Sequence, residues 1–109
     1  MHSFESSVRV IRPLGAITAA SADKFTQELV SAISSETAAE LMVDMSEVDT
    51  LDSAGLVSLM SALKTAQSLS KQLSLCSVPP SIRIVFELTQ LDRVFTFTEP
   101  LSVVEPVAA

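Results

Sequence analysis

One stretch of sequence decides the fold: LMVDMSEVDTLDSAGL, residues 41–56. It opens with a compact apolar run, residues 41–45, which is typical of a buried β-strand. A polar segment, residues 46–52, follows and is expected to be a loop. Asp52 and Ser53 are both good helix N-cap residues, and an amphipathic helix is predicted from about Ser53 to Leu69. Its apolar positions recur at spacings of three and four: Leu56, Leu59, Met60, Leu63 and Ala66.

Further elements are predicted on both sides of this stretch. Residues 7–12 alternate like a half-buried strand, and after Gly15 a second short strand at residues 16–18 is expected to turn back beside the first. Ser21 is a candidate cap for a helix whose apolar stripe is Phe25, Leu29, Val30 and Ile33. Residues 72–78 read as a strand, Pro79-Pro80 opens a helix, and residues 91–97 form a turn into a last strand.

The predicted order of elements is ββαβαβαβ. Strands that alternate with amphipathic helices indicate an α/β fold, here with a mixed sheet of about four to five strands entered by an antiparallel pair. In such sheets functional groups gather at the carboxyl ends of strands and at the helix N-termini that follow. That rule selects the loop from Asp44 to Gly55 as the functional region.

Length and composition predict one compact domain over residues 1–109. The chain has 109 residues, of which 48% are hydrophobic, and a single cysteine, Cys76. This size supports a core without disulfides or metal. No charge-free run approaches the ~18 apolar residues that a membrane helix needs, and no leader-like segment opens the chain. We therefore expect a cytoplasmic protein without membrane insertion.

The charge is acidic and concentrated in the middle of the chain. The net charge is −6, and the segment 25–63 contains seven acidic residues and no Lys or Arg. This balance argues against direct binding of nucleic acid. An acidic segment is either a solvated face or a surface that fits a basic partner.

Residue types that carry catalysis or hold cofactors are scarce. The only histidine is His2, next to a chain end, and Cys76 falls in a predicted strand, where an inert buried thiol is the ordinary reading. One cysteine and one histidine do not make a zinc site, and the phosphate-binding glycine motifs are absent. We expect neither an enzyme nor a protein with a metal or cofactor.

Gly55 is an unusual residue for the first turn of a helix, where it costs about 1 kcal/mol relative to alanine. A small residue there would leave the backbone open to an approaching partner or phosphate. The surrounding residues, Val43-Asp44-Met45-Ser46 and Leu51-Asp52-Ser53-Ala54-Gly55-Leu56, resemble the anti-sigma-factor-antagonist domains known as STAS domains. The segments 12–17 and 91–95 look like that family's early strand-glycine-strand and its late turn.

The resemblance implies a STAS fold and a protein-interaction switch. In that family the serine matching Ser53 is phosphorylated by a partner that is both a serine kinase and an anti-sigma factor, and a phosphatase reverses the reaction. The unmodified form binds the partner and releases a sigma factor. Ala54 stands where many relatives carry a second hydroxyl, and Thr50 is a weaker acceptor candidate.

The surface expected to bind the partner surrounds Ser53, with Ser58, Ser61 and Thr65 expected on the outer face of the helix. Its residues are Asp49, Thr50, Asp52, Ser53, Ala54, Gly55, Leu56 and Ser58.

Three other interpretations stay open. The chain could be a stand-alone STAS subunit of a signalling scaffold or a membrane-transporter complex. It could bind a nucleotide through the strand-end residues Asp44 and Ser46. Ser53 could also be an unmodified helix cap.

Overall fold

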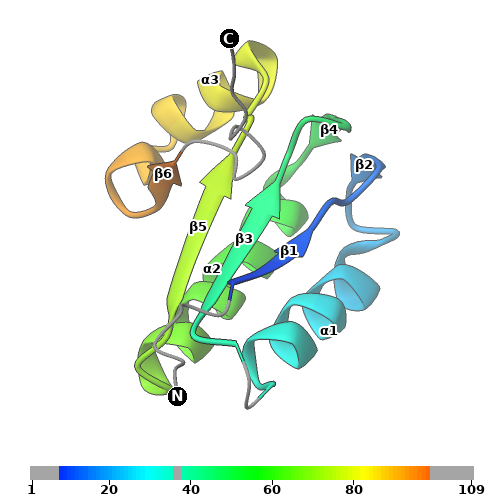
Figure 1. Cartoon of the computed structure of the whole chain (residues 1–109). Coiled ribbons are helices and arrows are strands. Elements are labelled where there is room, and N and C mark those ends of the chain that lie inside the picture. The colour runs from blue at the N-terminus through cyan, green and yellow to red at the C-terminus, as the bar shows by residue number, and fades with distance from the viewer. Residues whose placement is uncertain (1–7, 36–37, 99–109) are drawn as a thin grey trace, which may run out of the picture.

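The main sheet contains four parallel strands in the order β1-β3-β5-β6 (Figure 1). The computed structural model describes residues 8–35 and 38–98, so His2 and the C-terminal residues from 99 onward lie outside it. The strands are β1 (Val8–Ile11), β3 (Glu40–Asp44), β5 (Gln72–Cys76) and β6 (Thr96–Thr98). The α/β class and the predicted buried strand at residues 41–45 are confirmed.

A second, two-stranded sheet pairs β2 (Gly15–Ile17) with β4 (Val48–Leu51). β4 lies in the segment that was predicted to be a loop, and that prediction is wrong. Val48 and Leu51 are buried while Asp49 and Thr50 between them are exposed, so the strand lacks the strict alternation that sequence patterns detect. The order of elements is therefore ββαββαβαβ.

The predicted antiparallel pair at the start of the chain does not form. β1 pairs in parallel with β3, and β2 pairs in parallel with β4. The chain bends between β1 and β2, with Gly15 at a positive φ of 75°, but does not reverse. β3 and β4 follow the same course beside them, and the Gly15 amide donates to the Glu47 carbonyl at 2.9 Å. The parallel pair β2 and β4 therefore continues the parallel pair β1 and β3.

Three helices and one short 3-10 turn complete the described structure. They are α1 (Ala22–Ile33), α2 (Ser53–Ser68), α3 (Pro80–Leu88) and η1 (Leu91–Arg93). The predicted starts at Ser53 and after Pro79 are confirmed. Ser21 occupies the N-cap position of α1, yet its hydroxyl accepts from the Thr18 amide rather than from an amide of the helix.

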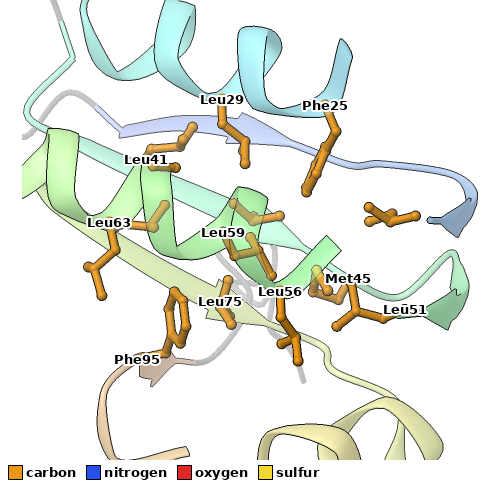
Figure 2. Close-up of a cluster of buried hydrophobic side chains, with 14 of the residues drawn as sticks. Phe25, Leu29, Leu41, Met45, Leu51, Leu56, Leu59, Leu63, Leu75 and Phe95 are labelled. Carbon is orange, nitrogen blue, oxygen red and sulfur yellow. The ribbon is translucent and has the colours of Figure 1, made fainter. Parts of the chain in front are cut away.

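The core lies between the main sheet and the helices α1 and α2, which pack against each other (Figure 2). Alternate residues of each parallel strand point to this side, as the period of a strand requires. The strands contribute Leu41, Val43, Leu73 and Leu75, and the helices contribute Phe25, Leu29, Leu59 and Leu63. This packing fixes the position of the α2 N-terminus, where the sequence placed the functional region.

Within the described residues no helix is long and apolar enough to cross a membrane, and no group of His, Cys, Asp and Glu is arranged to hold a metal ion.

Candidate functional site

The N-terminus of α2 is capped by Asp52, which leaves Ser53 as the first residue of the helix. The Asp52 backbone is extended, and its Oδ1 accepts a hydrogen bond from the Gly55 amide at 3.1 Å. This bond satisfies one of the amides that a helix start leaves without a partner. Ser53 is exposed. The interpretation of Ser53 as the helix cap is therefore wrong, because the neighbouring aspartate fills that role.

Asp52 also joins α2 to the segment between β2 and α1. Its Oδ2 accepts from the Ala19 amide at 3.2 Å, and its own amide donates to the Ile17 carbonyl at 3.2 Å. One residue thus connects the helix start to backbone groups more than thirty positions earlier in the chain. Ala19 has no sequence signature that would predict this role, because it contributes a main-chain amide.

Gly55 is buried, and the reason for a small residue there differs from the predicted one. A Cβ at this position would lie 2.5 Å from Leu51 Cδ1 and 2.7 Å from the Ile17 carbonyl oxygen. The glycine lets α2 sit directly on β2 and β4, rather than opening the helix backbone to a partner. Gly55 therefore affects a binding surface only indirectly, because the packing of α2 on β2 and β4 sets the position of Ser53.

The expectation that Ser58 lies on the outer face of α2 is wrong. Ser58 is only 3% exposed, and its hydroxyl donates to the carbonyl of Ala22 at 3.1 Å or of Ala54 at 3.2 Å. The close contact of α1 with α2 buries it. Leu56 is also buried, as a member of the core.

The accessible residues of the predicted surface lie on β4 and along α2. Asp49 and Thr50 are exposed on β4, Ser53 is exposed at the start of α2, and Asp52 and Ala54 beside it are half-buried. Ser61 and Thr65 further along α2 are half-buried as well. This region brings a free hydroxyl and two carboxylates together at the carboxyl end of the β-strands.

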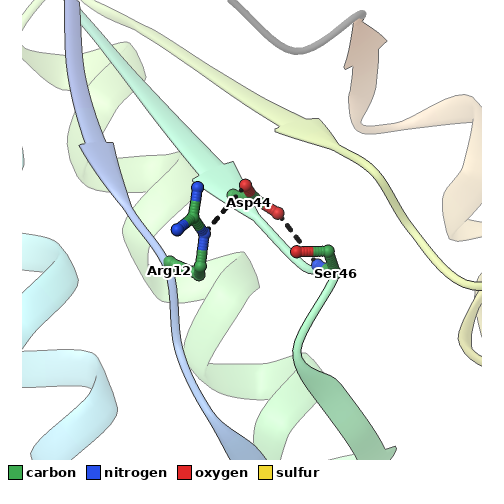
Figure 3. Close-up of polar contacts among 3 residues, drawn as sticks. All are labelled: Arg12, Asp44 and Ser46. Atoms are coloured by element: carbon green, nitrogen blue, oxygen red, sulfur yellow. Dashed lines mark hydrogen bonds and ion pairs between the residues drawn. The ribbon is translucent and has the colours of Figure 1, made fainter. Parts of the chain in front are cut away.

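Asp44 and Ser46 belong to a separate polar cluster (Figure 3). The Asp44 carboxylate pairs with the Arg12 guanidinium, Nε to Oδ2 3.0 Å, and its Oδ1 accepts from the Ser46 amide at 2.9 Å. Burial acts to raise the pKa of Asp44, but the hydrogen bonds from Ser46 and the Arg12 charge outweigh it and lower the pKa. Both oxygens of this carboxylate are therefore engaged within the protein.

Cys76 ends β5 next to Asp44 and is buried. Burial raises the pKa of the thiol, and the nearby Asp44 carboxylate acts in the same direction. A thiol held protonated in this way is a poor nucleophile. The predicted buried position of Cys76 is confirmed.

Comparison with known proteins identifies related sequences and structures. The family model of the STAS domain matches residues 3–103. An anti-sigma factor antagonist from Mycobacterium paratuberculosis is 23% identical, with a TM-score of 0.74 over 87% of this chain and 80% of the other. At this identity the likeness establishes the fold.

Two further solved structures show the range of proteins that share this fold. SpoIIAA, a Bacillus cell fate determinant solved in its phosphorylated form, has a TM-score of 0.66 at 15% identity, covering 91% of this chain and 87% of its own. A sulfate transporter family protein from Wolinella succinogenes has a TM-score of 0.71 at 17% identity, covering 83% and 75%.

Proposed function

We propose a function from the premise that this chain belongs to the STAS domain family. The protein acts as an anti-sigma factor antagonist, and phosphorylation of Ser53 controls it. In this proposal the unmodified protein binds a partner that is both an anti-sigma factor and a serine kinase, and a sigma factor is released. A phosphatase removes the phosphate. The protein binds its kinase partner and is phosphorylated by it in the cytoplasm, and it does not itself catalyse a reaction.

One observation carries the proposal: Asp52 caps α2, so the Ser53 hydroxyl is exposed at the helix start and is not needed for capping. Backbone amides and the helix dipole at this position favour a bound phosphate, so the fold accommodates it. The family resemblance and the anti-sigma factor antagonists among its structural neighbours support the same assignment.

The charges around Ser53 explain how a phosphate would act as a switch. Phosphorylation adds about −1.5 to −2 charge beside the carboxylates of Asp49 and Asp52. A partner docked over the helix start would have to desolvate this dianion and bear its repulsion. A penalty of ~3–4 kcal/mol lowers affinity several-hundredfold, which is sufficient for a switch without refolding.

The test is to identify what co-purifies with the Ser53→Ala variant from its native host, together with a map of phosphorylated residues in the wild-type protein. We expect the variant to retain a serine kinase of the anti-sigma type and the wild type to carry phosphate on Ser53. Ser53→Asp should bind the kinase more weakly than Ser53→Ala. Ser61→Ala, which removes a half-buried hydroxyl two turns further along α2, is the matched control.

A wild-type protein that carries no phosphate on Ser53, or equal binding of both phosphorylation states, contradicts the switch. Capture of transporter or scaffold subunits by the Ser53→Ala variant would instead support a role as a STAS subunit of such a complex. The likeness to the sulfate transporter family protein is the observation that favours this second candidate.

A further inference from the structure

A groove of about 640 Å³ runs between α1 and α2, beginning beside Ser53. Ala54, the residue after Ser53, lies at its edge, and Val57 follows one helical turn after Ser53. Residues four apart lie on the same face of a helix, so Val57 and Ser53 belong to the same row. The lining residues are Ala22, Asp23, Thr26 and Gln27 from α1, and Ala54, Val57, Ser58 and Ser61 from α2.

The exposed surface of the groove is more apolar than polar, although several of its lining residues carry polar groups. The Ser58 hydroxyl is bonded to carbonyls of the two helices, and the Thr26 hydroxyl donates to the Ala22 carbonyl at 2.9 Å. These hydroxyl donors are therefore satisfied within the protein. The groove presents aliphatic surface, chiefly the side chain of Val57, which is 63% exposed, beside the polar side chains of Asp23, Gln27 and Ser61.

Val57 is exposed although it is a large aliphatic residue in a helix that has a well-defined buried stripe. It falls outside the series Leu56, Leu59 and Leu63 that packs into the core. Unlike the other exposed aliphatic residues of α2 and α3, Val57 lines a groove, so a partner side chain that entered the groove would remove its surface from water.

The charge of the groove is of one sign. Asp23, in the first turn of α1, is the single charged residue of the lining. The exposed Asp49 lies near the same end of α2, while Lys24, the neighbour of Asp23, lines a different pocket, and no Lys or Arg occurs from residue 25 to residue 63. A cationic side chain of a partner would be complementary to this surface, whereas an acidic one would be repelled.

We propose that the groove receives an aliphatic side chain of the serine-kinase partner, packed on Val57, with a neighbouring basic residue facing Asp23. The inference rests on the proposed function and adds a second contact point to it. A partner held in this groove is brought alongside Ser53, so the same docking arrangement serves both binding and phosphorylation.

The experiment is site-specific photo-crosslinking in the native host, on the Ser53→Ala background to keep the protein in its binding form. A benzophenone amino acid replaces Gln27, which lines the groove, or Leu88, which is 80% exposed on α3. We expect an adduct with the kinase from position 27 only. The crosslinked kinase peptide should contain an aliphatic residue next to Lys or Arg.

Charge and size variants then test the two contacts. Val57→Lys and Asp23→Lys should each lower the adduct yield about tenfold, since each removes a central contact of the docked partner. Ile84→Lys is the matched control, because it places the same charge on an exposed aliphatic site of α3 and should leave the yield unchanged. Circular dichroism of each variant verifies the fold.

Four results overturn the inference: no adduct from position 27, equal adducts from positions 27 and 88, no effect of Val57→Lys, or an adduct with a second copy of this chain. The map of phosphorylated residues in the wild-type protein shows whether the groove proposal alone fails or whether the proposed function fails too. Phosphate on Ser53 without a groove adduct rejects the groove alone. Absence of phosphate on Ser53 rejects the switch.

Discussion

Adjacent residues at the start of α2 have different tasks. Asp52 caps the helix and binds the Ala19 amide, Ser53 presents its hydroxyl to solvent, and Gly55 allows the helix to contact β2. The short motif therefore combines two structural residues with one exposed hydroxyl. Each of these tasks predicts a different effect of substitution.

Gly55→Ala tests the structural task. The added methyl group overlaps the Leu51 side chain and the Ile17 carbonyl, and overpacking of this kind costs typically 1–3 kcal/mol, against a gain of about 1 kcal/mol in helix propensity. We expect the free energy of unfolding to fall by up to about 2 kcal/mol, measured by urea denaturation.

Val57→Ala is the control for this substitution, because Val57 is exposed on the same helix and its truncation should change stability by no more than about 0.5 kcal/mol. An increase in stability of Gly55→Ala would mean that helix propensity alone governs the position, and the close contact with β2 would then be unimportant.

At the scale of elements, Lys71 from the segment before β5 stabilises the C-terminal end of α1. Its Nζ donates to the carbonyl of Ile33 at 2.7 Å and to that of Ser35 at 2.5 Å. The last turn of α1 contains no basic residue of its own. A cation beside helix-terminal carbonyls is favourable, and here it comes from a different part of the chain.

Lys71→Met should remove this contact while keeping the aliphatic stem. We expect the free energy of unfolding to decrease by about 1–2 kcal/mol, observed as a fall of several degrees in Tm. Lys64→Met removes an exposed lysine from α2 and serves as the control, with little effect expected. Equal changes in the two variants would show that net charge, and not the contact with α1, determines the result.

At the scale of the whole molecule, a phosphate on Ser53 should leave the fold intact. The site is exposed and lies at a helix N-terminus, where a negative charge contributes roughly 0.3–1 kcal/mol of stabilisation. We expect phosphoserine at position 53, introduced during synthesis, to leave the far-ultraviolet circular dichroism unchanged. The free energy of unfolding should change by no more than about 1 kcal/mol.

Phosphoserine at position 58 is the contrasting control. That hydroxyl is buried between α1 and α2, so a dianion there should prevent these helices from packing. Loss of cooperative unfolding in the Ser53 form would indicate that the switch acts by refolding, and not by repelling a partner from an unchanged surface.

The elements whose apolar residues repeat regularly were predictable without the structure. The period of three and four in α2 and the apolar run of β3 identify them, because burial of one helix face or of a whole strand leaves a regular pattern. The motif around Ser53 also predicted a helix start directly after a strand, and α2 begins there. The net charge and the composition follow from the sequence alone, because they depend only on residue counts.

The pairing of the strands and the exposure of the hydroxyls depend on contacts that no sequence pattern predicts. β4 is a strand because β2 lies beside it, although half of its own residues are polar and exposed. Ser58 is buried because α1 crosses next to it, and Gly55 is required because Ile17 occupies the space of a side chain. These outcomes depend on contacts between segments more than thirty residues apart, and no local pattern records which segment will be the neighbour.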